Sequence, residues 1–226
     1  MGCAQLRATL PSDAAASAHA GRGTAGRCRA GIPPALARWY LRRLGTARRV
    51  LDAGCGTGVL ARAAGGQIEF HGLDSDPAAV ALAGRYGQAA VWDLESGPLP
   101  FTSAFFDAVV AKDVIEHVDR PLELLLEFRR VLRPGGILLA SVPMAKPRAV
   151  WDDYTHVRGF TRNALAYLTQ DAGFRVSGVR RMGPLPLASR LGLIALVPLL
   201  LRLPGLSYFA RSWEICAARA AEVPDV

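Results

Sequence analysis

Several features that would assign a chain to a specialised class are scarce in this sequence. The four cysteines, at positions 3, 28, 55 and 216, show neither zinc-ligand spacing nor a disulfide framework, which predicts free thiols in a reducing cytoplasm. Residues 1–30 lack the apolar core of a cleavable signal peptide. The apolar run over residues 191–201 is too short for a bilayer-spanning helix, which needs about 20 residues. These absences predict a cytoplasmic protein without a transmembrane helix.

Lysine is scarce as well, so arginine supplies almost all of the 27 basic residues. The formal net charge of +8 is confined to residues 1–49, where nine arginines stand against one aspartate, which leaves 18 basic and 18 acidic residues in the rest of the chain. A basic arm can bind nucleic acid or an anionic membrane surface. Because arginine dominates along the whole chain, a compositional bias of the genome is the simpler explanation.

Length and apolar content indicate one core. A chain of 226 residues with 51% hydrophobic content can form a single α/β domain, which we place at residues 32–219. Residues 1–31 are rich in Ala, Gly, Ser and Arg without periodicity, which predicts a disordered basic arm. Residues 220–226 are expected to form a frayed tail.

Glycines alternate at one place, in Gly54, Gly56 and Gly58. An apolar run ending in Asp52 precedes them and an alanine-rich stretch follows, which predicts a strand, a tight turn and a helix. Glycine tolerates positive φ and lets a ligand approach the backbone to contact distance. The turn is therefore predicted to bind a nucleotide-like ligand, and its spacing fits both S-adenosylmethionine (SAM) and dinucleotide sites.

A second predicted strand, residues 68–74, ends in Asp74. A carboxylate at this place in a nucleotide-binding sheet accepts hydrogen bonds from the ribose hydroxyls. Residues 88–95 are predicted to form the third strand and its exit, and residues 107–112 the fourth. A turn at residues 133–136 and a fifth strand at residues 137–142 follow.

Together with Asp52, the wording LDAGCGTG at residues 51–58 and LRPGG at residues 132–136 resemble the class I SAM-dependent methyltransferases. The likeness is to the small-molecule branch that includes quinone-biosynthesis-like methyltransferases, and it covers residues 35–219. It implies an α/β, Rossmann-like, doubly wound sheet of seven strands in the order 3-2-1-4-5-7-6, with helices on both faces. The last strand, residues 212–219, is expected to be antiparallel.

The resemblance also implies SAM as cofactor and a set of residues that bind it. Asp93 is expected to accept the adenine amino group and the Leu94 backbone to meet the ring, because an adenine edge needs one acceptor and one donor. Lys112 is expected to line the methionine part of SAM or the mouth of the substrate site. The full predicted cofactor site consists of Asp52, Gly54, Gly56, Gly58, Asp74, Asp93, Leu94 and Lys112.

Two histidines are the candidate catalytic groups. His117 follows the fourth strand, and its imidazole can take a proton from an attacking hydroxyl near neutral pH, with a structural role beside the site as the alternative. His156 lies in the polar, aromatic loop of residues 151–161, where it either contacts substrate or joins Asp152 and Arg158 in a hydrogen-bonded buckle. No Asp/His cluster with metal-ligand spacing stands out in the sequence, so no metal is expected.

The insertion at residues 184–210 is too apolar for a surface loop. It is expected to form a hydrophobic lid that both walls a pocket for an apolar or lipid-linked acceptor and touches the inner face of a membrane through residues 185–209. The alternatives are a subunit contact in a homodimer and packing in the core. Five arginines around it favour the membrane, since an interfacial segment keeps cations at headgroup level. These are Arg180, Arg181, Arg190, Arg202 and Arg211.

These observations predict a SAM-dependent methyltransferase that acts on a small-molecule or lipid-like acceptor, with the acceptor atom undetermined. Residues 112–115 differ from the Asn-Pro-Pro-Tyr sequence of many nucleic-acid base methyltransferases, so no nucleic-acid partner is expected. The alternatives are a SAM-binding module without catalysis and an NAD-type oxidoreductase on the same strand, turn and helix.

Overall fold

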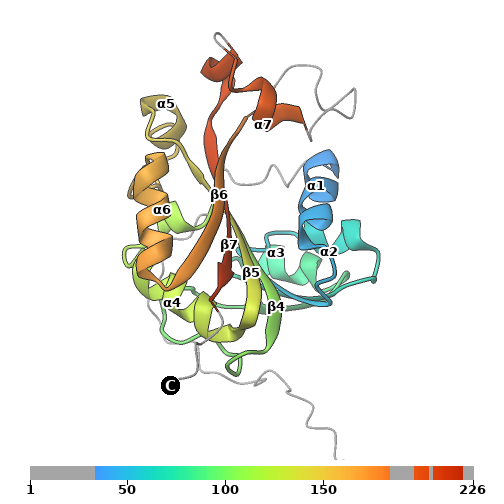
Figure 1. Ribbon diagram of the computed structural model, residues 1–226. Coiled ribbons are helices and arrows are strands. Elements are labelled where there is room, and N and C mark those ends of the chain that lie inside the picture. The colour runs from blue at the N-terminus through green and yellow to red at the C-terminus, as the bar shows by residue number, and fades with distance from the viewer. Residues whose placement is uncertain (1–33, 184–195, 204–205, 221–226) are drawn as a thin grey trace, which may run out of the picture.

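A computed structural model describes residues 34–183, 196–203 and 206–220 (Figure 1). The strands are β1 (Arg49–Ala53), β2 (Glu69–Asp74), β3 (Gln88–Val91), β4 (Phe106–Lys112), β5 (Leu132–Pro143), β6 (Phe174–Met182) and β7 (Ser212–Arg219). The α-helices are α1 (Pro34–Leu44), α2 (Val59–Ala64), α3 (Pro77–Ala83), α4 (Pro121–Val131), α5 (Pro147–Val150), α6 (Arg162–Asp171) and α7 (Val197–Leu200). Two 3₁₀ turns are η1 (Ile115–His117) and η3 (Leu206–Phe209).

All seven strands form one sheet in the order β3-β2-β1-β4-β5-β7-β6, which confirms the expected topology. Strands β1 to β5 pair in parallel, whereas β7 is antiparallel to both of its neighbours, β5 and β6. The inserted antiparallel strand distinguishes this sheet from the 3-2-1-4-5-6 order of dinucleotide-binding domains.

The central strands are apolar on both faces because helices cover both faces (Figure 1). Side chains alternate along a strand, so Val50 packs toward the core that contains α1 and α2, while its neighbour Leu51 packs toward the core that contains α4 and α6. On β5, Leu139 likewise packs in the core with α1 and α2, and Leu138 packs in the core with α4 and α6. The parallel strands therefore end together at one edge, and that edge positions the candidate site.

One strand boundary, the start of β5, differs from the sequence prediction. β3 covers the start of the predicted strand and exit at residues 88–95 and ends at Val91, opposite the last residue of its partner β2, Asp74. β5 begins at Leu132, so the predicted turn at residues 133–136 lies within the strand. Gly135 there has a φ of 74°, and the pairing with β4 shifts register between Phe106 and Ala108.

The apolar insertion is described only in part. Val197 and Leu201, on and beside α7, are buried in the core, whereas Leu199 remains 60% exposed. Among the described residues, no helix is long and apolar enough to cross a membrane. The predicted basic arm, most of the tail and the first half of the insertion lie outside the described residues.

Candidate functional site

The turn of residues 54–58, called the glycine turn below, joins the end of β1 to α2. Its three glycines all have positive φ: 73° at Gly54, 50° at Gly56 and 74° at Gly58. A Cβ on Gly54 would lie 2.5 Å from Val114 Cγ2, and one on Gly58 would lie 2.7 Å from Ala83 Cα. A Cβ on Gly56 would meet no protein atom within 4 Å. Packing therefore requires two of the glycines, and only Gly56 faces space that a ligand can enter.

Asp74 at the end of β2 holds this turn in place. Its Oδ2 accepts a hydrogen bond of 2.8 Å from the Gly56 N–H, and its Oδ1 accepts one of 3.0 Å from the Asp76 N–H. A carboxylate oxygen has two lone pairs, so both oxygens can also accept from ligand hydroxyls. The half-buried Asp74 thus lies where the ribose role predicted for it is possible, and that role stays a prediction.

Asp52 lies deeper, at 4% exposure on β1. Burial and then the charge of Asp74 raise its pKa, the ammonium of Lys112 opposes them, and the net result is a pKa of about 7. Asp52 therefore lies behind the turn, within electrostatic reach of two other residues of the predicted cofactor site.

Asp93 and Leu94 lie beyond the end of β3 rather than on it. The Trp92 N–H donates a 2.9 Å bond to the Asp74 carbonyl, which ties this segment to the end of β2. Asp93 is exposed, and its Oδ1 accepts from the Glu95 N–H at 2.9 Å. The adenine acceptor that the sequence predicts is therefore next to the predicted ribose acceptor, on neighbouring strand ends.

Lys112 at the end of β4 forms an ion pair with Asp113. Asp113 has a φ of 54°, uncommon for a residue with a side chain, and is held there by Ser141 on β5. The Asp113 N–H donates to the Ser141 carbonyl at 2.9 Å, and the Ser141 hydroxyl donates to Asp113 Oδ1 at 2.9 Å. Lys112 follows the residue that pairs with Ala53 at the end of β1, and its contact with the methionine part of SAM stays a prediction.

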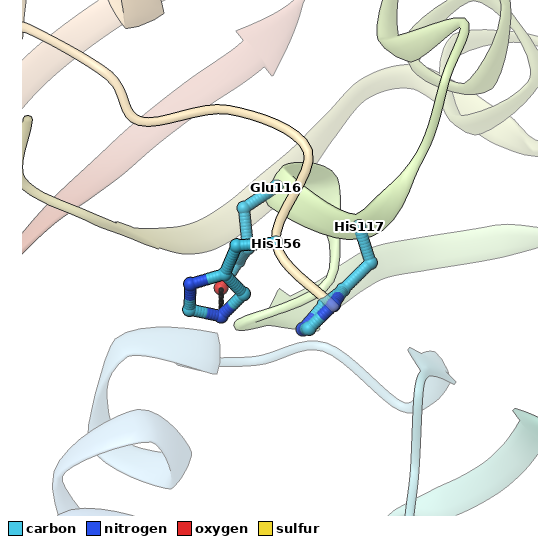
Figure 2. A group of neighbouring side chains, drawn as sticks. All are labelled: Glu116, His117 and His156. Atoms are coloured by element: carbon cyan, nitrogen blue, oxygen red, sulfur yellow. Dashed lines mark ion pairs between the residues drawn. The ribbon is translucent and has the colours of Figure 1, made fainter. Parts of the chain in front are cut away.

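Glu116, His117 and His156 form a second group, called the histidine cluster below (Figure 2). Glu116 and His117 lie on η1 directly after β4, and His156 reaches them from the loop after α5. The imidazole centroids are 4.7 Å apart, and His156 Nε2 lies 3.9 Å from Glu116 Oε1. The structure therefore brings together the two predicted catalytic histidines and adds Glu116, which the sequence analysis missed.

Backbone carbonyls orient both imidazoles. His156 Nδ1 lies 2.7 Å from the Val150 carbonyl, and His117 Nδ1 lies 3.3 Å from the Thr155 carbonyl and 3.1 Å from its hydroxyl. A carbonyl only accepts, so these contacts favour, in the neutral form of each imidazole, the tautomer with the proton on Nδ1 and the lone pair on Nε2. Burial lowers the pKa of His117, and the neighbouring His156 lowers it further, which keeps the imidazole neutral near pH 7.

The carboxyl group of Glu116 is the unusual member of the cluster. The residue is fully buried, and neither carboxyl oxygen has a hydrogen-bond partner among the described residues. Burial raises its pKa well above the usual value, and the charge of Asp113 adds to that effect. A carboxyl in such a place is either protonated or balanced by a cation.

The loop that carries His156 is fastened to the body by its own hydrogen bonds. The Val157 N–H donates to the Glu116 carbonyl at 2.9 Å, and Arg158 Nη2 donates to the Asp119 carbonyl at 2.9 Å. Asp153 accepts from the Thr155 hydroxyl at 2.6 Å. His156 and Arg158 thus bond to backbone carbonyls as members of the predicted buckle, whereas Asp152 is exposed and Asp153 braces the loop in its place. Contact of this loop with substrate stays a prediction.

Comparisons with known proteins agree with this geometry. A family model described as a methyltransferase domain matches residues 24–178. A Mycolicibacterium smegmatis protein named as an S-adenosylmethionine-dependent methyltransferase is 36% identical over 138 residues, which is 57% of this chain and 52% of that protein. The ubiquinone biosynthesis O-methyltransferase of Haemophilus ducreyi is 30% identical over 105 residues, covering 42% of this chain and 44% of that enzyme. This chain spans about half the length of the curated relatives it matches.

Among solved structures, a SAM-dependent methyltransferase from Archaeoglobus fulgidus superposes with a TM-score of 0.63 at 19% identity. The superposition covers 82% of this chain and 92% of that one, and it concerns the fold alone. The family model, in contrast, matches most of this chain and includes the glycine turn and the histidine cluster. The chain therefore belongs to the methyltransferase domain family, and its resemblance to the class I SAM-dependent methyltransferases is confirmed.

Proposed function

We propose that this protein binds SAM at the glycine turn and transfers the methyl group to a small-molecule acceptor. The observation that carries the proposal is the arrangement at the ends of β1, β2 and β3. Gly56 faces open space, the Asp74 carboxylate lies directly against it, and Asp93 follows on the next strand end. A turn, a ribose acceptor and an adenine acceptor in that order suit an adenosine ligand.

For methyl transfer from SAM, the main task of the protein is to position the methyl donor and the acceptor. The sulfonium of SAM is already an activated methyl donor, so the site must exclude water and hold the acceptor in line with the methyl carbon. An acceptor that loses a proton would give it to the lone pair of His117 or His156, at the end of the neighbouring β4. An acceptor that is already deprotonated needs neither histidine.

We propose an apolar or lipid-linked acceptor, because apolar side chains remain exposed in the loop that carries His156 and on α7. Trp151 and Tyr154 in the loop after α5 are 64% and 81% exposed, and Leu199 on α7 is 60% exposed. Figure 1 shows α5 and α7 at the same end of the molecule. These groups suit peripheral contact with the inner face of a membrane, and the same surface also suits a homodimer contact.

Two other functions remain to be separated from this one. An NAD-type oxidoreductase shares the strand, turn and helix, but the antiparallel β7 and the methyltransferase family model favour SAM. A SAM-binding module without catalysis would share every feature of the cofactor site.

The test is methyl transfer from labelled SAM into aqueous and organic fractions of a cell extract. Label that enters an organic-soluble product supports the proposed acceptor class, and label that enters only water-soluble products contradicts it. SAM binding without transfer to any fraction would favour the non-catalytic module. The matched control is Asp74→Ala, in which binding and transfer should fall together.

A further inference from the structure

We propose that Glu116, His117 and His156 form a binding site for one divalent first-row transition ion of the zinc type. All three residues offer a ligand atom, and these atoms lie within 4.8 Å of one another. Imidazole nitrogen and carboxylate oxygen are the donors that Zn²⁺, Co²⁺ and Mn²⁺ share in proteins. The three residues come from two segments that meet only in the folded chain (Figure 2).

The orientation of the imidazoles supports the proposal independently of their proximity. Metal-binding histidines usually donate the second ring N–H to a carbonyl or carboxylate, which fixes the tautomer and aims the free nitrogen at the ion. His156 does so toward the Val150 carbonyl and His117 toward Thr155. Thr155 is in turn held by Asp153 Oδ1, which accepts from both its N–H and its hydroxyl. The outer support that a metal site needs is therefore built into the loop.

Glu116 supplies the second independent observation. Its carboxyl group is fully buried, has no hydrogen-bond partner among the described residues and lies beside the His156 Nε2. An isolated buried carboxylate costs several kcal/mol, and a bound cation offsets that cost. No other described residue would need to move into the site to complete a three-ligand set.

The ligand atoms must close slightly on binding. Zinc bonds of about 2.1 Å in tetrahedral geometry separate ligand atoms by about 3.4 Å, so a pair 4.8 Å apart must approach by about 1.4 Å. Three protein ligands leave a fourth position open, as in catalytic rather than structural zinc sites.

The site is next to the glycine turn, since Val114, two residues before Glu116, lies so near Gly54 that a Cβ there would fall 2.5 Å from Val114 Cγ2. This step rests on the proposed function. A hydroxyl oxygen of the acceptor binds the ion at the open position, and the ion lowers the pKa of that hydroxyl. The hydroxyl proton leaves to water, the oxygen bonds to the methyl carbon, and the carbon–sulfur bond breaks with its electron pair remaining on sulfur. The two imidazole lone pairs are then ligands rather than proton acceptors.

The experiment titrates untagged, chelator-treated protein with Zn²⁺ by calorimetry and with Co²⁺ by visible absorption. We expect one equivalent of each ion and cobalt bands typical of nitrogen and oxygen ligands. Glu116→Gln should weaken binding at least about tenfold, and a His117→Ala/His156→Ala variant at least about 100-fold. His71→Gln is the matched control, because His71 also contacts a carboxylate, Glu69 at 2.8 Å, but outside the cluster.

Wild-type protein that takes up less than one equivalent, or variants that bind as tightly as wild type, would overturn the metal site. The wild-type titration tests the metal site by itself, so the test remains valid even if a variant fails to fold. SAM titration of the same chelated samples separates the two inferences. SAM binding without Zn²⁺ binding supports the proposed function and overturns the metal site. Zn²⁺ binding without SAM binding supports the metal site and overturns the proposed function.

Discussion

The glycine turn and the histidine cluster lie on neighbouring strand ends but are assembled in different ways. The turn is a continuous run, residues 54–58, whose backbone conformation depends on residue type at each position. The cluster joins η1 to the loop after α5, in which Thr155 lies 38 residues after His117 in the sequence. The comparison shows that a site made by local backbone geometry can be predicted from the sequence, whereas a site made by docking a loop needs the fold.

The largest expected effect is on stability, and it distinguishes the glycine that packing requires, Gly58, from the one that faces open space, Gly56. Gly58→Val places Cβ against the Ala83 backbone at positive φ, and should lower the free energy of unfolding by about 3 kcal/mol or more. Gly56→Ala meets no protein atom and should lower it by only about 1–2 kcal/mol. Urea unfolding of both variants measures the difference. Equal losses would mean that the two glycines do not have the distinct roles assigned to them.

The next effect tests the ribose acceptor. Asp74→Ala removes two charge-assisted hydrogen bonds, each worth about 1.5–3 kcal/mol, so SAM affinity should fall at least about 100-fold by calorimetry. Part of the loss comes from the turn itself, because Asp74 also holds the Gly56 N–H. Asp76→Asn, which keeps the cap of α3, should bind SAM normally and serves as the control. Wild-type affinity in Asp74→Ala would refute the assignment.

Glu214 is a buried acid outside the glycine turn and the histidine cluster, and it serves as a reference case for the effect of burying a carboxyl group. Burial raises the pKa of Glu214 on β7 to about 8, opposed first by Arg43 and then by Arg180. Between pH about 4.5 and 8 the unfolded chain loses this proton while the folded chain keeps it, so stability should fall as pH rises, by at most about 1.4 kcal/mol per pH unit. Above pH 8 this contribution no longer changes.

Thermal unfolding at a series of pH values checks this slope. Glu214→Gln should flatten it, because the amide does not titrate. Glu123→Gln is the control, since Glu123 is exposed and paired with Arg120. A slope that is the same in both variants and the wild type would show that Glu214 is not the responsible group.

The smallest expected effect concerns the exposed apolar surface near α7. Flotation with anionic vesicles at low salt should carry the wild type, and a Leu199→Ser/Leu203→Ser variant should float several-fold less, because about 0.8 kcal/mol is lost for each CH₂ no longer buried in lipid. Leu122→Ser/Leu126→Ser changes two exposed leucines of α4 and should float like wild type. Wild-type protein that stays in the soluble fraction would disprove the membrane contact.

Much of the fold could be predicted because its signals are local. The last strand has the predicted bounds, 212–219, since β7 lies between two long strands that pair along its whole length. Within the predicted strand and exit at residues 88–95, the point where β3 ends depends on the last residue of its partner β2, which residue composition does not reveal. Consequently Asp93 lies in the connection after β3, although its order along the chain is as expected.

The histidine cluster could be predicted only in part. His117 and His156 were recognisable by residue type, but they meet only where the loop of His156 docks on η1, through bonds such as that from the Val157 N–H to the Glu116 carbonyl. Glu116 itself carried one signal, an acid within the apolar stretch of residues 114–118, which indicates burial. Spacing along the chain could not show a metal-ligand set, because its members come from separate segments.

The most direct test of the central claim is calorimetric titration of the wild-type protein with SAM and, separately, with NAD, repeated on Gly56→Val. The account predicts one equivalent of SAM bound by the wild type, no binding of NAD, and loss of SAM binding in a variant that still shows a folded circular dichroism spectrum. Binding of NAD in place of SAM, or SAM affinity unchanged by Gly56→Val, would contradict it.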